Sequence, residues 1–546
     1  MKNCNDSDDH MNNVKEMAES VRQGKLDRRE FLALASTLGA SATLAYGLIG
    51  LSNPVLAQSA EATKGGTLKV AMNVKWIGDP RAYDWTEMGN LSRQFLEPLV
   101  RWNTDFTFSG VLLLDWDVSE DALTYTLRLR QDALWNNGDK FVADDVVFNF
   151  ERWCDKSAEG NAMAIRMASL IDPDTGAARD GAIEKVDDHT VRLNLSHPDI
   201  TLIASMSDYP ALIVHRNFDP EAGLAKNPVG TGPFELVSLD VGEKAMVSRR
   251  DGGWWGGEPF LDAIEFLDYG TDPAAVSAAF EAGEVHINDL TSPDFAPVLD
   301  GVGLSSKNAL TAATMVARMR SDSAPYDNVV VRKAIQKAVN NEVVLELGYG
   351  GQGLVAENHH VGPMHPEYAK LPIVKNDAAE ANRMMAEAGH LGTEIELISV
   401  AGDWRSTASD AIAAMLRDAG LNIKRTQIPG STFWNGWKDY PFSTTDWGPR
   451  PLGVQVLALA YMSDSFWNES AHKNPEFDKL LQEAMGVFDA EKRAAMMGDI
   501  QRLLQDSGAI IQPFWTNNTK HHTPDVQGIE MHQAREMNFE NVWIEA

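Results

Sequence analysis

The sequence predicts an α/β protein built from two or three domains, and three observations lead to this prediction. The chain has 546 residues, which is more than one hydrophobic core usually supports. Between residues 377 and 426, segments with helical periodicity alternate with segments of strand character, as in α/β domains. Strand patterns also occur far apart in the chain, at residues 65–72 and 510–515.

The first half of the chain is predicted to be rich in strands. Alternation of Tyr125, Leu127 and Leu129 with polar residues indicates a half-buried strand. Two acids, Asp144 and Asp145, favour a helix start because they oppose the helix dipole. The predicted elements are strand 65–72, helix 91–100, a strand over 125–129, a helix from 142, hairpin 183–193, strands 235–239 and 263–269, and helix 273–282.

The second half is predicted to alternate between helices and strands. The apolar positions of each helix recur at helical spacing, and Gly389 and Gly420 follow two of them as stop signals. The predicted elements are strand 314–320, helix 330–340, helix 377–388, strand 395–400, helix 407–419, strand 423–426, helix 491–507 and strands near 510–515.

The N-terminal segment has the features of an export signal. Arg28 and Arg29 precede an apolar, small-residue run over residues 32–51, and Val55-Leu56-Ala57 follows as an A-x-A-like cleavage site. The paired arginines resemble a twin-arginine signal. We expect cleavage after Ala57 and a periplasmic protein. The alternative is a membrane anchor, although the run is only mildly apolar.

Composition excludes several classes of function. The formal net charge of −30 would repel nucleic acid and anionic membrane surfaces, so neither is an expected partner. Of the two cysteines, only Cys154 lies beyond the signal, so no intrachain disulfide is expected. No nucleophile–base set or phosphate loop is found, and we expect neither an enzyme nor a bound cofactor. The grouped histidines (His359, His360, His365, His521 and His522) lack zinc-site spacing and are expected to lie in surface loops.

One stretch, residues 433–468, concentrates the aromatic residues. It contains Trp434, Trp437, Trp447 and Trp467. Indole rings that combine an apolar surface with an N–H donor are typical of ligand pockets. The alternative is a tryptophan-rich core element.

Several motifs, in order, resemble the extracytoplasmic solute-binding proteins of the peptide/nickel ABC-transporter class, solute-binding protein family 5. The motifs are YTLRLR (125–130), WNNG (135–138) with Phe141, DDVVF (144–148), NPVGTGPF (227–234), residues 254–264, AAFEAGEVHI (278–287), VRKAI (331–335) and NPEFDKL (474–480). The resemblance covers nearly all of the chain after the signal. Two small departures are His286, where the family often has Asp, and Trp135-Asn136-Asn137 in place of Phe-His-Asp.

The resemblance implies a two-lobed periplasmic-binding-protein fold of the type II, large peptide-binding class, with an inserted subdomain in the first lobe. The lobes would close on a ligand by a hinge motion. We place the signal at residues 1–57, lobe I at 58–310 plus 515–546, its inserted subdomain at about 104–215, and lobe II at 311–514. The implied partners are a small-molecule ligand and the permease subunits of an ABC importer, and we expect a monomer.

The resemblance also suggests how a peptide would be held. Many members hold the ligand's α-amino group with an aspartate, and Asp446 matches that position, although Arg450 replaces the usual acid before Pro451. Arg405 lies in the loop from which dipeptide binders supply an arginine to the carboxylate. As alternatives, Asp446 caps the helix that starts near Leu452, and Arg405 pairs with Asp403 or Asp410.

The remaining candidate residues complete the expected site. Arg450 is a second anion-binding candidate, and its presence opens the alternative of an opine or another acidic conjugate. A quaternary amine or an oligosaccharide is a further alternative, and nickel or haem a remote one. The ligand-facing walls are expected from Trp404, Trp434, Trp447 and Trp467, and the first-lobe contacts from Tyr83, Met88 and Asn90.

Overall fold

The structure is a computed structural model that describes residues 6–24, 26–51, 62–119, 121–270, 272–465, 467–487 and 490–545. The chain forms two compact units. Unit 1 comprises Met1–Ala309 and Asn518–Ala546, and unit 2 comprises Leu310–Asn517. The chain therefore passes between the units twice, within the strands β12 (Ser305–Met319) and β18 (Phe514–His522).

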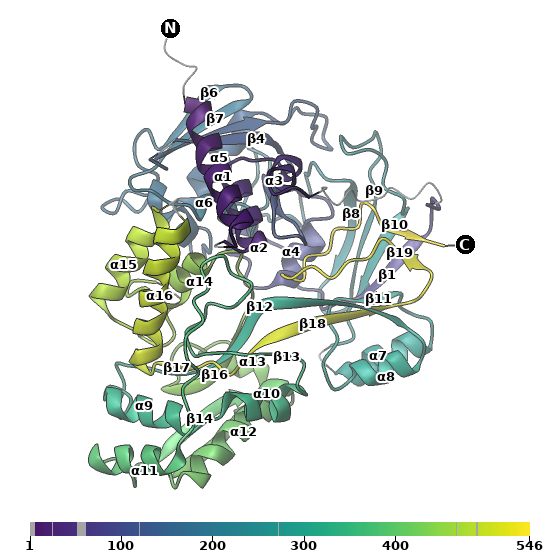
Figure 1. The fold of residues 1–546 in the computed structure, drawn as a ribbon. Coiled ribbons are helices and arrows are strands. Elements are labelled where there is room, and N and C mark those ends of the chain that lie inside the picture. Colours follow the sequence, from purple (N-terminus) through teal and green to yellow (C-terminus); the bar gives the residue numbers. More distant parts are fainter. Residues whose placement is uncertain are drawn as a thin grey trace. The chain divides into compact units, whose positions relative to one another are not determined.

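The main sheet of unit 1 is built around strand β1 (Thr67–Ala71), which matches the strand predicted at residues 65–72. Leu68 and Val70 of β1 are fully buried in the core, as strand alternation requires. Figure 1 shows β8, β9 and β10 side by side next to β1. The order is β11 (Ile287–Asn288), β1, β10 (Ala263–Leu267), β9 (Lys244–Arg249) and β8 (Phe234–Asp240), with β1 parallel to β10 and β11.

Unit 1 also contains helices and short strands outside this sheet. The helices are α4 (Thr86–Ser92), α5 (Ala143–Trp153), α6 (Leu202–Ser205), α7 (Pro273–Glu281), α8 (Ala296–Gly301) and the 3-10 helices η1 (Pro80–Ala82) and η2 (Ala164–Leu170). The further strands are β2 (Val100–Trp102), β3 (Phe108–Gly110), β19 (Val526–Gln527) and β20 (Trp543–Ile544). The helix predicted at residues 91–100 is wrong, since α4 ends at Ser92. Pro98 is also incompatible with the interior of a helix over these residues, because it lacks an N–H and its ring clashes with the carbonyl four residues earlier.

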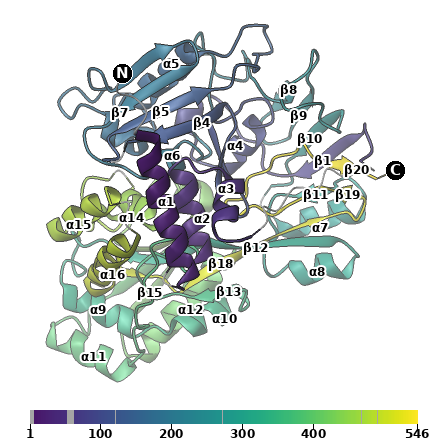
Figure 2. The same ribbon diagram turned by 45° about the horizontal axis from the view of Figure 1, so that its top comes forward.

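A second, antiparallel sheet lies within the segment predicted as the inserted subdomain. Its order is β4 (Leu113–Val118), β5 (Thr124–Leu129), β7 (Thr190–Asn194) and β6 (Ile183–Asp187), and β6 and β7 form the predicted hairpin. Figure 2 shows this sheet with α5, which packs against β6 and β7.

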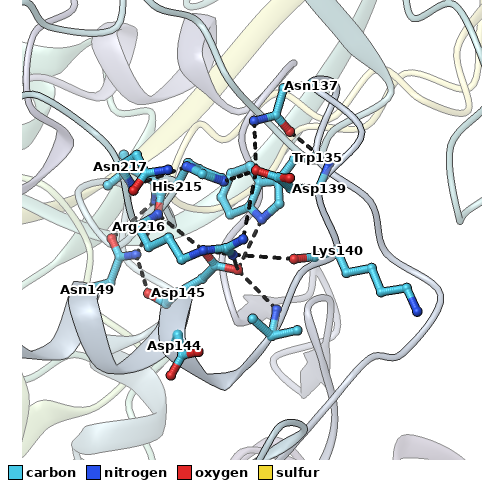
Figure 3. A network of polar contacts seen from close by, with 12 residues as sticks. Trp135, Asn137, Asp139, Lys140, Asp144, Asp145, Asn149, His215, Arg216 and Asn217 are labelled. Atoms are coloured by element: carbon cyan, nitrogen blue, oxygen red, sulfur yellow. Dashed lines mark hydrogen bonds and ion pairs between the residues drawn. The ribbon is translucent and has the colours of Figure 1, made fainter.

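A buried carboxylate, Asp145 in the first turn of α5, ties this region together (Figure 3). It accepts hydrogen bonds from the Trp135 indole at 3.1 Å, from the Val142 backbone N–H at 3.0 Å and from the Arg216 backbone N–H at 3.1 Å. The Arg216 guanidinium also lies 2.9 and 3.0 Å from its two oxygens. Two of the sequence motifs, WNNG and DDVVF, are thus parts of one buried network.

The loop with two adjacent tryptophans, Trp254 and Trp255, closes on another buried carboxyl group, Glu97. The two indole N–H groups donate to separate oxygens of Glu97 at 3.1 and 2.9 Å. Burial raises the pKa of Glu97 from 4.5 to about 7, although the indole hydrogen bonds act in the opposite direction. Ionised Glu97 is therefore destabilising in the folded state.

We expect the stability of unit 1 to fall as pH rises from about 4.5 through 7, by roughly 3 kcal/mol in total from this group. The folded pKa lies above the unfolded one, so the stabilisation is complete below the unfolded pKa and is lost above the folded pKa. Thermal unfolding of wild type and Glu97→Gln between pH 4.5 and 8 tests this. The variant should show a flatter pH dependence, and identical slopes in the two proteins would contradict the assignment.

The N-terminal segment forms α1 (Asp6–Arg22), α2 (Arg28–Thr37) and α3 (Ala42–Leu48). The predicted signal arginines begin α2, and Asp27 caps it by accepting from the Arg29 backbone N–H at 2.8 Å. The predicted cleavage site after Ala57 lies outside the described residues. Among the described residues, no helix combines the length and apolar character that crossing a membrane requires.

Unit 2 is the α/β domain that the alternating pattern predicted. Its strands follow the order β15 (Ile423–Ile428), β14 (Ile395–Val400), β16 (Phe442–Trp447) and β12, with β14 parallel to both β15 and β16. β13 (Gly353–Val355) pairs with β18, and β17 (Ile510–Ile511) pairs with β12. The helices are α9 (Val329–Lys337), α10 (Asn341–Tyr349), α11 (Ala378–Glu387), α12 (Trp404–Asp418), α13 (Gly430–Phe433), α14 (Gly453–Tyr461), α15 (Pro475–Met485) and α16 (Ala490–Ser507).

Helix α12 positions the candidate site. Its fully buried stripe of Ala408, Ile412 and Leu416 recurs every four residues and packs into the core of unit 2. α12 lies against β14 and α10 (Figure 1). The helix begins three residues before the predicted start, because Asp403 serves as its N-cap. Arg405 consequently lies in the first helical turn and not in the preceding loop.

Candidate functional site

Two of the predicted ligand-binding residues, Arg405 and Asp446, bind each other. Asp446 is the penultimate residue of β16, and its Oδ1 lies 2.6 Å from Nε of Arg405. The Arg405 guanidinium also bonds to the carboxylate of Asp403. The alternative pairing of Arg405 with Asp403 is therefore correct, whereas Asp410 binds Arg425 at 2.7 Å. Asp446 lies in a strand and is not the cap of α14, whose N-cap is Leu452.

This group of three side chains, Asp403, Arg405 and Asp446, is called the acidic triad below. Burial by itself would lower the pKa of Arg405, but Asp446 and Asp403 outweigh it and raise the pKa. The formal charges of one guanidinium and two carboxylates give the triad one net negative charge. The side chains of Asp446 and Asp403 are 33% and 31% exposed, so this charge is accessible to a solute.

Aromatic rings lie on two sides of the triad. The Arg405 guanidinium carbon is 5.0 Å from the centre of the Trp404 ring and 5.9 Å from the Trp434 ring. Trp404 packs on the core through Tyr349 and Phe514, and Trp434 packs edge-on against Phe433. The structure thus brings four of the predicted site residues together: Arg405, Asp446, Trp404 and Trp434.

A buried ion pair that sequence reasoning missed holds Trp447. Glu469 accepts hydrogen bonds from the Trp447 indole at 2.7 Å and from the Thr445 hydroxyl at 2.6 Å. Its other oxygen is 3.0 Å from Nε of Arg318, and both charged side chains are almost completely buried. Arg318 also donates to the carbonyls of Trp437 and Tyr440. The one signal in the sequence was an arginine inside the apolar run Met315–Met319.

Arg450 and Trp467 lie next to Trp447. The Trp447 and Trp467 rings are 6.1 Å apart in an edge-to-face arrangement, and the Arg450 guanidinium carbon lies 6.0 Å from the Trp467 ring. Arg450 is 7% exposed and donates to the carbonyl of Pro449 at 2.9 Å. Both predicted anion-binding arginines are therefore in unit 2, and each has protein oxygens as neighbours.

The three candidates from unit 1 have structural contacts. Tyr83 is completely buried, and its hydroxyl lies 2.6 Å from the Ser92 hydroxyl. Asn90 binds the C-terminal segment through the Arg535 carbonyl at 3.0 Å and the Met537 N–H at 3.1 Å. Met88 packs against the hydrophobic core. Of these, Met88 is the one that is partly exposed.

The expectation that the grouped histidines are surface residues is wrong. His359, His360 and His365 follow β13, His521 and His522 belong to β18, and all five side chains are buried. Burial lowers the pKa of both His359 and His365 to about 4, so these rings are neutral. In the part of the chain that the structure describes, no group of three or more His, Cys, Asp or Glu side chains is arranged to hold a metal ion.

Comparison with known proteins assigns the fold and the class. The family model of bacterial extracellular solute-binding proteins, family 5 Middle, matches residues 107–469. The periplasmic oligopeptide-binding protein OppA of Haemophilus influenzae is 24% identical over 497 residues, covering 82% of this chain and 88% of that protein.

Two solved structures show the same fold. Haemophilus influenzae OppA in complex with the peptide RPPGFSPFR has a TM-score of 0.79 at 20% identity, covering 89% of this chain and all of the other. The binding protein AgaA of A. tumefaciens R10 in complex with agropinic acid has a TM-score of 0.78 at 20% identity, covering 88% of this chain and 99% of the other. The predicted two-lobed α/β periplasmic-binding fold is confirmed.

Proposed function

The chain belongs to the bacterial extracellular solute-binding proteins of family 5, and from this we propose that it captures a peptide or a peptide-like, amine-bearing solute for an ABC importer. The acidic triad is the observation that supports this ligand class. A ligand ammonium needs a carboxylate, because an unpaired charge out of water costs several kcal/mol.

The triad suits a cation better than an anion. Its two carboxylates surround a single guanidinium, so an incoming ammonium would complete the charge balance. The faces of Trp404 and Trp434 point toward the same guanidinium and would also favour a cation. A carboxylate entering beside Asp446 would be repelled. The proposed role of Arg405 is thus to orient Asp446, and not to bind a ligand carboxylate itself.

The proposal includes the route by which the protein reaches its ligand. The arginine pair at the start of α2 and the small-residue site at Ala57 support export by the twin-arginine pathway, followed by cleavage and release into the periplasm. There the protein acts as a monomer and delivers its solute to the permease.

A second candidate ligand is an opine. Arg450 stands where the resemblance to the family implies an acid, and the similar protein AgaA was solved with agropinic acid. An opine combines amine nitrogen with additional carboxylates, which would use the triad and Arg450 together. The two candidate ligand classes, peptides and opines, differ in the number of carboxylates: the opine candidate requires a solute with more than one.

The test is calorimetric titration with tripeptides, their N-acetylated forms and opines. We expect free-amine tripeptides to bind and Asp446→Asn to weaken them roughly 100-fold, or about 2.7 kcal/mol, because the triad becomes neutral. Asp410→Asn is the matched control, since Asp410 lies on α12, pairs with Arg425 and is 53% exposed. Circular dichroism should show intact folds.

Acetylated and free tripeptides that bind equally would exclude Asp446 as the amine ligand. Binding of opines without any peptide binding would select the second candidate.

A further inference from the structure

A second polar cluster in unit 2, called the corner below, is centred on His360, whose side chain is completely buried. Its ring is 5.6 Å from Trp447, 5.5 Å from Tyr461 and 6.1 Å from Trp515. These neighbours come from three separate elements, β16, α14 and β18. The His360 ring therefore lies edge-to-face with Trp447, one of the proposed walls of the ligand site.

The hydrogen bonds assign the position of the proton on His360. The Tyr461 hydroxyl lies 2.6 Å from Nδ1. Burial raises the pKa of Tyr461 and lowers that of His360, so the hydroxyl keeps its proton and the ring is neutral. The hydroxyl then donates to Nδ1, and the ring proton is on Nε2. His360 consequently presents an N–H donor at Nε2.

Two buried N–H donors at this corner have no acceptor among the described residues: Nε2 of His360 and Nε1 of Trp515. The side chain of Trp515 is also completely buried, and Gly362 packs against its ring, where a Cβ would come within 2.7 Å. A buried donor without a partner is destabilising, because it has lost its hydrogen bonds to water. Two such donors around one aromatic cluster make this corner a candidate site for an acceptor.

The neighbouring groups favour a negatively charged acceptor. The positive charge of Arg450 contributes, after burial and the neighbouring histidines, to the lowered pKa of His360. The backbone carbonyl of Arg450 is 3.1 Å from Nε2 of His365, whose ring lies edge-on to Trp515 at 6.0 Å. A guanidinium with two neutral N–H donors is a favourable environment for an oxyanion.

We propose that His360 and Trp515, together with Arg450, bind a carboxylate of the solute. This inference rests on the proposed function and extends it, because the acidic triad and this corner would bind the two opposite charges of a zwitterion. The carboxylate is the C-terminus of a peptide or an acid group of an opine, and the experiment distinguishes these sources.

The experiment is native mass spectrometry of the purified protein after equilibration with a tripeptide library that has free C-termini, with the same library amidated, and with octopine. We expect the wild type to retain free-acid tripeptides at least tenfold better than amides. His360→Phe and Trp515→Phe should each lose this preference. His360→Gln should keep much of it, because its amide N–H reaches about as far as Nε2.

The matched control is His472→Phe. His472 is a buried histidine that packs against the same Tyr461 ring at 6.4 Å, but its Nδ1 is paired with the Tyr461 carbonyl at 3.1 Å. This variant should lose stability and keep the preference for free acids.

Each outcome decides the inference. Equal retention of acids and amides by the wild type, or an unchanged preference in both His360→Phe and Trp515→Phe, overturns it and leaves the amine proposal standing. The wild type could instead retain octopine and neither tripeptide library. In that case, loss of octopine in His360→Phe and Trp515→Phe supports the proposed carboxylate site, and unchanged octopine retention in both variants overturns it. A wild type that retains none of the probes overturns both proposals.

Discussion

Glu469→Ala is expected to lower the free energy of unfolding of unit 2 by about 3–5 kcal/mol and to abolish solute binding. The substitution leaves the Arg318 guanidinium buried without its carboxylate, although Arg318 would still donate to the carbonyls of Trp437 and Tyr440. A guanidinium does not lose its proton at neutral pH, so the protein cannot avoid this cost by neutralising the group. Urea unfolding measured by tryptophan fluorescence gives the change in stability.

Binding should fail for a separate reason. Glu469 is the acceptor for the Trp447 indole and the Thr445 hydroxyl, and these residues flank Asp446 in β16. The Arg318 contacts to Trp437 and Tyr440 hold the preceding loop in the same way. One buried ion pair therefore fixes both the strand that presents Asp446 and the tryptophan-rich segment before it.

A double substitution separates the two effects. Arg318→Met combined with Glu469→Leu removes both charges, and apolar replacement of a buried ion pair is often neutral or stabilising. We expect it to recover most of the lost stability but not the binding, because the Trp447 indole still lacks its acceptor. Glu387→Ala is the control, since the Arg383–Glu387 pair is exposed to solvent and should contribute little to stability. Full recovery of binding in the double variant would show that the pair does not position the site.

The sequence predicted individual elements of unit 2 well and its side-chain pairings poorly. The strand at residues 395–400 agrees with β14 at both ends, because a short apolar run is bounded by polar and glycine residues. The sequence predicts both Arg405 and Asp446 as site residues, but as binders of opposite ligand charges. They are 41 positions apart, and only the parallel arrangement of β14 and β16 brings α12 and β16 together.

The other differences between the predictions and the structure arise where residues far apart in the sequence bury one another. Glu469 and Arg318 are 151 positions apart, and nothing local to Glu469 indicates a buried acid. The histidines at 359–365 follow polar residues and lie among Gly362, Pro363 and Pro366, which indicated a loop correctly but suggested exposure. Whether a loop is covered depends on the rings of Trp447, Tyr461 and Trp515, which come from distant parts of the chain.

Asp145→Ala is the second substitution with a large expected effect, about 3–5 kcal/mol on the unfolding of unit 1. Asp145 is completely buried, and its loss leaves the Trp135 indole and two backbone N–H groups without this acceptor (Figure 3). The Arg216 guanidinium loses its closest carboxylate and keeps Asp139, at 3.8 Å. Each buried donor that loses its partner adds a desolvation penalty. The change should appear as a lower urea midpoint, with β5–β7 and α5 unfolding first.

The neighbouring residue supplies the control. Asp144 has the same chemistry one position earlier, but its side chain is 55% exposed and pairs with Lys185 at 3.0 Å on the surface. Asp144→Ala should therefore change the unfolding free energy by less than about 1 kcal/mol. Equal effects of the two substitutions would mean that helix-dipole stabilisation, which both acids provide, outweighs the buried network. A large difference would show that the second acid of the DDVVF motif is required by the packing of WNNG against residues 214–216, and not by solute binding.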